Sequence, residues 1–82
     1  MMDQRAIAAR ILDLVRARGQ DRTICPSEVA RALADDWRPL LVAVRAVAVE
    51  LARSGQVRVT QRGRPVDPQT AKGPIRLGLP KA

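Results

Sequence analysis

Apolar residues recur at helical spacing in three stretches of the chain, with polar residues between them. The first stretch covers residues 3–18, and Asp3 is placed to cap its N-terminus. The second covers residues 26–34 and opens on Pro26, whose missing N–H is tolerated at a first helical position. The third covers residues 38–54. The pattern therefore predicts three amphipathic helices.

The start of the third helix has two readings. Arg38 precedes Pro39 and is disfavoured in helical geometry, which puts the boundary between them. Alternatively, Asp36 caps the helix and Trp37 lies inside its first turn. Gly55 ends the helix in either case.

After Gly55 the apolar period changes from helical to two, which is typical of half-buried strands. Residues 56–62 and 74–79 both alternate in this way and predict an antiparallel hairpin. The loop from Arg62 to Pro74 is long for a hairpin and contains three prolines. Within it, Asp67 and Pro68 favour a single helical turn. Thr23 and Ile24 favour a further short extended piece.

The elements together predict one domain over residues 1–82, mainly α with a small β-hairpin. Three helices followed by strand, basic loop and strand is the order of a winged helix-turn-helix, in which the two-stranded hairpin is the wing. The predicted core is aliphatic, because the chain has one Trp and no Phe or Tyr. It comprises Ile7, Ile11, Leu14, Val15, Ile24, Val29, Leu33, Leu40, Val44, Val47, Leu51, Val57, Val59, Ile75 and Leu77.

Four segments also carry a resemblance to a known family. They are Thr23-Ile24-Cys25-Pro26-Ser27-Glu28-Val29-Ala30, Trp37-Arg38-Pro39, and Thr60-Gln61-Arg62-Gly63-Arg64-Pro65-Val66-Asp67 with Gly73-Pro74-Ile75-Arg76-Leu77. The chain resembles, over nearly its whole length, a family of short bacterial proteins catalogued as a domain of unknown function. That family is regarded as winged-helix-like, so the resemblance implies the same fold. It implies no catalytic or binding residues.

Cysteine and histidine usage restricts the chemistry. The single cysteine, Cys25, excludes an internal disulfide, and we expect a cytoplasmic protein. Without histidine the chain lacks the commonest general base and the commonest zinc ligand, so we expect no enzyme, no metal and no cofactor. Cys25 at a helix start is interpreted as a small buried residue rather than a nucleophile. No apolar run approaches the roughly 20 residues of a membrane span, and we expect no membrane partner.

The net charge of +7 lies entirely in the second part of the chain. Residues 1–37 contain six basic and six acidic residues, whereas residues 38–82 contain nine basic and two acidic ones. This asymmetry places the surplus charge on the third helix and the hairpin. It favours a polyanionic partner, and nucleic acid, most simply double-stranded DNA, comes first.

The predicted nucleic-acid-binding residues are all basic. On the third helix, Arg38 lies at the start, while Arg45 and Arg53 line the groove side; the wing residues hold flanking phosphates. The helix offers few other side chains that read bases, so we expect little sequence preference. The alternative is a solvated basic surface on a structural helix. The full set is Arg38, Arg45, Arg53, Arg58, Arg62, Arg64, Lys72 and Arg76.

A second hypothesis is a protein-interaction or homodimer module. Val42 and Val49 fall on the predicted outer face of the third helix, where exposed apolar residues favour a protein contact. Trp37, the only aromatic residue, is interpreted as a plug between helices, with base stacking as the alternative.

Overall fold

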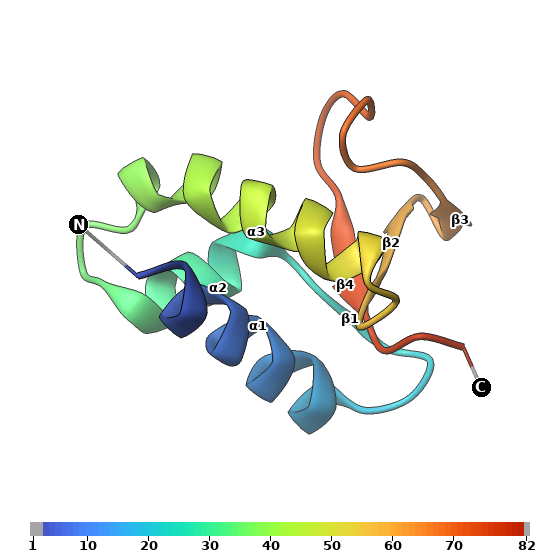
Figure 1. The fold of residues 1–82 in the computed structure, drawn as a ribbon, viewed down its shortest axis with the longest axis horizontal. Coiled ribbons are helices and arrows are strands. Elements are labelled where there is room, and N and C mark those ends of the chain that lie inside the picture. Colours follow the sequence, from blue (N-terminus) through green and yellow to red (C-terminus); the bar gives the residue numbers. More distant parts are fainter. Residues whose placement is uncertain (1–2, 82) are drawn as a thin grey trace.

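A computed structural model describes residues 3–81 of the chain. Three helices lie together at one end of the molecule, and a small sheet forms the other end (Figure 1). Within the described residues no helix has the length and apolarity that a bilayer crossing requires. The elements in order are α1 (Gln4–Arg18), β1 (Thr23–Ile24), α2 (Pro26–Leu33), the 3-10 turn η1 (Arg38–Leu40), α3 (Leu41–Arg53), β2 (Arg58–Gln61), β3 (Arg64–Pro65) and β4 (Arg76–Gly78).

The ends of α1 and α3 follow local capping chemistry. The Asp3 carboxylate accepts a hydrogen bond from the backbone N–H of Arg5 at 2.9 Å, as predicted for the N-cap. At the end of α3, the N–H of Gln56 donates to the carbonyl of Leu51 at 2.9 Å and that of Gly55 to Ala52 at 3.1 Å. This pair of bonds is the Schellman pattern. Because Gln56 completes the helix end, β2 begins at residue 58 and not at the predicted residue 56.

The third helix starts in two steps. The N–H of Leu40 donates to the carbonyl of Trp37 at 3.0 Å, which is the spacing of a 3-10 turn. Pro39 lies in this turn, and regular α-helical geometry begins only at Leu41. The predicted single helix over residues 38–54 is therefore a 3-10 turn followed by a shorter α-helix.

The sheet has four antiparallel strands in the order β1-β4-β2-β3, rather than the two predicted. The predicted pairing of the hairpin strands is confirmed, with Val59 opposite Leu77 and Thr60 opposite Arg76. The extended pair Thr23–Ile24 adds to the other edge of β4, which makes β4 a central strand. Three helices and this small sheet are compatible with the predicted winged-helix arrangement.

A tight turn accounts for the fourth strand. Arg62 and Gly63 both have positive φ, 51° and 80°, and they alone connect β2 to β3. Two positive-φ residues form the type I′ turn that suits the twist of a hairpin. Arginine rarely occupies such a position, so the Arg62-Gly63 dipeptide only weakly indicates a tight turn in the sequence. The predicted long loop is thus a tight turn, strand β3 and a shorter loop over residues 66–75.

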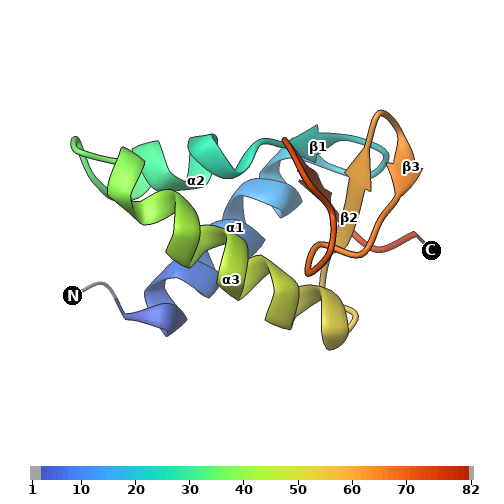
Figure 2. The same cartoon turned by 90° about the horizontal axis from the view of Figure 1, so that it is seen from above.

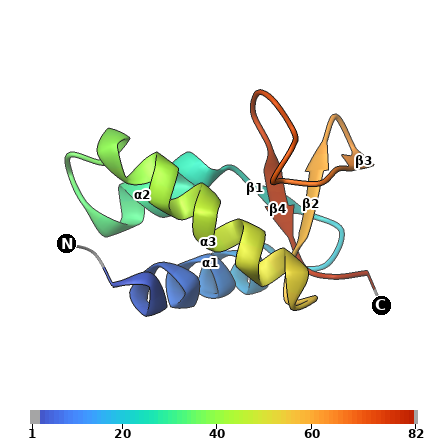
Figure 3. The same ribbon diagram turned by 45° about the horizontal axis from the view of Figure 1, so that its top comes forward.

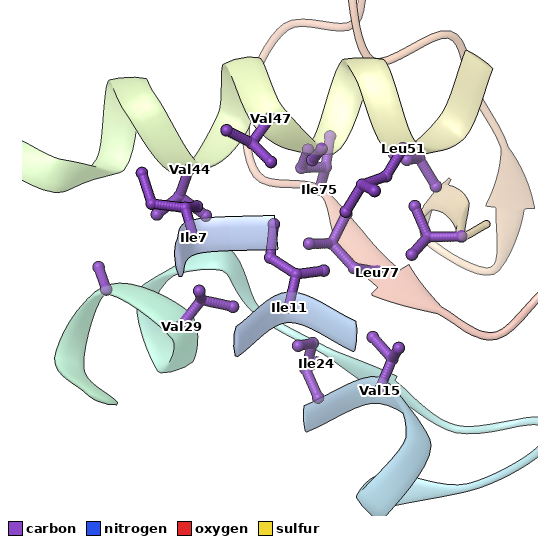
Figure 4. Packing of buried hydrophobic residues seen from close by; sticks show 14 residues of the cluster. Ile7, Ile11, Val15, Ile24, Val29, Val44, Val47, Leu51, Ile75 and Leu77 are labelled. Atoms are coloured by element: carbon purple, nitrogen blue, oxygen red, sulfur yellow. The ribbon is translucent and has the colours of Figure 1, made fainter. Parts of the chain in front are cut away.

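The core is the aliphatic cluster that the sequence predicts, with five differences. Side chains from α1, α2, α3 and β4 converge between the layers (Figure 4). Leu14, Leu33 and Leu40 were predicted inside but are only partly buried at the rim of the cluster. Conversely, Ala30 and Ala48 are fully buried, because small side chains let the helices approach closely.

Glu28 caps α2 and connects it to α1. Its carboxylate accepts a hydrogen bond from the backbone N–H of Cys25 at 2.7 Å and forms an ion pair with Arg18. The bond from Cys25, aided by the charge of Arg18, lowers the pKa of Glu28 below its usual value. Because the pKa is lower in the folded state, the ionised carboxylate stabilises the fold above its unfolded-state pKa. This contribution is lost as the pH falls through the folded-state pKa.

Replacing Glu28 by glutamine is therefore expected to lower the free energy of unfolding more at pH 7 than at pH 3. The effect should stay below about 1 kcal/mol, because the Glu28 side chain is 37% exposed and its ion pair is screened. Urea unfolding at both pH values measures it. Glu50→Gln, which removes a more exposed carboxylate, is the matched control. Equal destabilisation by Glu28→Gln at both pH values would contradict the assignment.

Candidate nucleic-acid interface

Arg45 fastens the loop after β3 to helix α3. Its guanidinium donates to the carbonyl of Gly73 at 2.9 Å and to that of Ala71. From the other side, the amide of Gln61 donates to the carbonyls of Lys72 and Pro74 at 2.7 and 3.0 Å. Four consecutive carbonyls, those of residues 71–74, are thus bound alternately from α3 and from β2. The half-buried Arg45 therefore positions the loop, whereas the sequence pattern predicted that it lies on the side of the helix that faces the DNA groove.

Replacing Arg45 by alanine should release residues 71–74 from α3. Two hydrogen bonds from a charged donor are lost, and we expect the free energy of unfolding to fall by about 1–2 kcal/mol. Backbone ¹⁵N relaxation should show increased motion confined to this loop. Arg38→Ala, an exposed arginine that binds no loop carbonyl, serves as control. If residues 71–74 remain as ordered as in the wild type, Arg45 does not hold the loop.

The same loop covers part of the outer face of α3. Figure 2 shows it beside the C-terminal half of the helix, where Arg53 donates to the side chain of Gln69 at 2.7 Å and also pairs with Glu50. Val49 is half-buried and shares a concave surface with Val66. By contrast, Val42 is 81% exposed. Of the two valines on which the protein-interaction hypothesis rests, only Val42 is therefore exposed. That hypothesis stays a prediction.

Arg38 lies at the opposite end of α3. Its guanidinium stacks 4.7 Å from the centre of the Trp37 ring, and that of Arg31 stacks 4.6 Å from the same ring. Trp37 is half-buried against the core, in agreement with its interpretation as a plug. Arg38 is exposed.

The remaining predicted residues gather around the hairpin. Arg62, Arg64, Lys72 and Arg76 line one concave region between the tight turn and the loop, and we call these four residues the wing surface. All four are exposed. Among residues 3–81, ion pairs join Arg18 to Glu28 and Arg53 to Glu50 only. The charges of the wing surface are therefore not neutralised within the described part of the chain.

Arg58 lies on the face of the sheet turned away from the helices. It is opposite Gly78 in the register of β2 and β4, and its Nε donates to the carbonyl of Leu79 at 2.8 Å. On the same face, Arg76 donates from Nε to the Thr23 hydroxyl and from Nη2 to the Thr23 carbonyl, both at 3.0 Å. Sequence reasoning missed Thr23 and Gln61, because both act through contacts that only the folded sheet creates.

Cys25 is half-buried at the start of α2, where its sulfur accepts a hydrogen bond from the Ser27 hydroxyl at 3.1 Å. Within the described part of the chain, no group of three or more His, Cys, Asp or Glu side chains is placed to hold a metal ion. The chemistry that the site displays is consequently that of exposed guanidinium and ammonium groups.

Comparison with known proteins agrees with the resemblance read from the sequence. No curated protein matches the chain. A family model described as "Protein of unknown function (DUF3253)" matches residues 4–80, nearly all of the 82-residue chain. The protein therefore belongs to this family of unknown function.

Proposed function

We propose that this domain is a non-enzymatic nucleic-acid-binding module that contacts the phosphates of double-stranded DNA through its wing surface. The observation that carries the proposal is the set of four exposed cationic side chains that line one concave region, without an acidic partner among residues 3–81. Arginine and lysine in such numbers are typical of phosphate contacts.

The backbone of the tight turn supports the same proposal. Arg62 holds φ = 51°, a conformation that disfavours residues with a Cβ atom. Glycine or asparagine would satisfy the turn at lower conformational cost. An unfavourable local conformation at an exposed charged residue is typical of functional positions.

In this proposal α3 supports the interface more than it reads bases. Arg45 and Arg53 hold the loop that carries Lys72, so they act as positioning residues for the wing surface. Arg38 remains as a peripheral phosphate contact near the start of the helix. Few side chains on α3 are then left to distinguish base pairs, and the domain should bind different sequences alike.

Fluorescence anisotropy with two labelled duplexes of unrelated sequence tests the proposal. If about four phosphates are neutralised, affinity should fall roughly 100-fold between about 50 and 200 mM salt. The two duplexes should show equal affinities and equal salt slopes. Absence of binding to either duplex at the lower salt concentration would refute the proposal.

A further inference from the structure

A second basic concavity lies on the outer face of the sheet. It is an open groove of about 520 Å³, a volume within the range of small-molecule sites. It shares Arg62 and Arg76 with the wing surface, while Arg58 and Lys81 belong to the groove and Arg64 and Lys72 to the wing surface. The lining residues are Asp21, Thr23, Arg58, Thr60, Arg62, Gly63, Arg76 and Lys81.

The arginines of this groove are held in place by the sheet itself. Arg76 uses two of its N–H groups on Thr23, and Arg58 uses one on Leu79. A guanidinium has five N–H donors, so three remain on Arg76 and four on Arg58. Because these bonds already fix the side chains, less conformational entropy is lost when the remaining donors bind a ligand.

Gly78 makes the arrangement of Arg58 possible. A Cβ atom at this position would lie 3.3 Å from Nε of Arg58 and 2.9 Å from the carbonyl oxygen of Arg22. The bare backbone of β4 therefore lets Arg58 lie across the sheet. Beside it, Thr60 is 3% exposed although it points away from the core, because the arginines and β3 flank it.

The charges in the groove favour an anion with several acceptor oxygens. Four cationic side chains face one acidic side chain, Asp21, which gives a local formal charge of +3. Planar guanidinium groups match phosphate oxygens in pairs. We propose that this groove is a phosphate-binding site, which takes a phosphate group through Arg58 and Arg76 with Lys81 nearby. This inference goes beyond the proposed function, since it assigns a site that adjoins the wing surface at Arg62 and Arg76 but is built on Arg58, which the wing surface lacks.

NMR titration of the full chain with inorganic phosphate tests the site, with sodium chloride at equal ionic strength as reference. We expect saturable shifts at the amides of Thr23, Arg58, Thr60 and Arg76 that chloride does not produce. Arg58→Gln should weaken phosphate binding about tenfold. Arg58→Lys keeps the charge but loses paired contacts, and should weaken it less. Arg10→Gln, an exposed residue on α1 outside both basic surfaces, should leave phosphate affinity unchanged.

The phosphate group could belong to an internal phosphodiester of DNA or to a small phosphorylated molecule. A DNA duplex without terminal phosphates distinguishes these two sources. If the groove takes an internal phosphodiester, the duplex should displace inorganic phosphate, and Arg58→Gln should weaken duplex binding too. If it takes a small phosphorylated molecule, Arg58→Gln should weaken phosphate binding and leave duplex binding unchanged, because Arg58 does not line the wing surface. Shifts that chloride reproduces, or an Arg58→Gln variant with wild-type phosphate affinity and an otherwise unchanged spectrum, would overturn the site. Neither result would affect duplex binding through Arg64, so the two proposals fail separately.

Discussion

Val44→Asp is expected to unfold the domain, whereas Val42→Asp, two residues earlier on the same helix, should leave it folded. Val44 is completely buried against α1 and α2 in an aliphatic cluster (Figure 4). A carboxylate there would find no partner and would cost several kcal/mol, a large part of the roughly 5–15 kcal/mol that stabilises a typical domain. Circular dichroism and urea unfolding measure the loss.

The Val42 substitution is the matched control. Val42 is 81% exposed and is the second residue of α3, where a negative charge interacts favourably with the helix dipole. Its free energy of unfolding should stay within about 0.5 kcal/mol of the wild type. Similar stability of the two variants would show that this face of α3 does not form the core.

Replacing Arg62 and Arg64 together by alanine should weaken duplex binding and flatten its salt dependence. If four phosphates are neutralised, the slope of log affinity against log salt is about −3.6, and loss of two contacts should bring it to about −1.8. The weakening should be the same for all sequences, because phosphate contacts carry no base information. Both side chains are exposed, and alanine has the same difficulty with positive φ as arginine, so the fold should persist.

Arg10→Ala with Arg16→Ala is the matched control for this double variant. Both residues are exposed on α1, in the electrically balanced part of the chain, and their loss changes the net charge by the same amount. Affinity and salt slope should remain close to the wild type. If the α1 variant lowers the slope as much as the wing variant, binding responds to net charge alone and the wing surface has no special role.

Local sequence patterns were enough to predict the helices and most of the core. Apolar spacing, the Asp3 cap and the change of period at Gly55 located α1, α2, most of α3 and the pairing of β2 with β4. These features depend on residues close in sequence, where side-chain period and capping chemistry act directly. The charge asymmetry between residues 1–37 and 38–82 is likewise a property of the sequence. By itself this asymmetry predicts a polyanionic partner at the third helix and the hairpin, and that partner stays a prediction.

The roles of the individual arginines were decided by the tertiary structure. Arg45 and Arg62 look alike in the sequence, yet one binds loop carbonyls while the other sits exposed on a tight turn. β1 lies beside β4 (Figure 3), and this pairing brings Thr23 to Arg76, 53 residues away in the sequence. Both residues line the groove on the outer face of the sheet. Distant segments supply the acceptors that decide which N–H groups of an arginine form hydrogen bonds within the fold. Only folding therefore determines which charges remain available for a ligand.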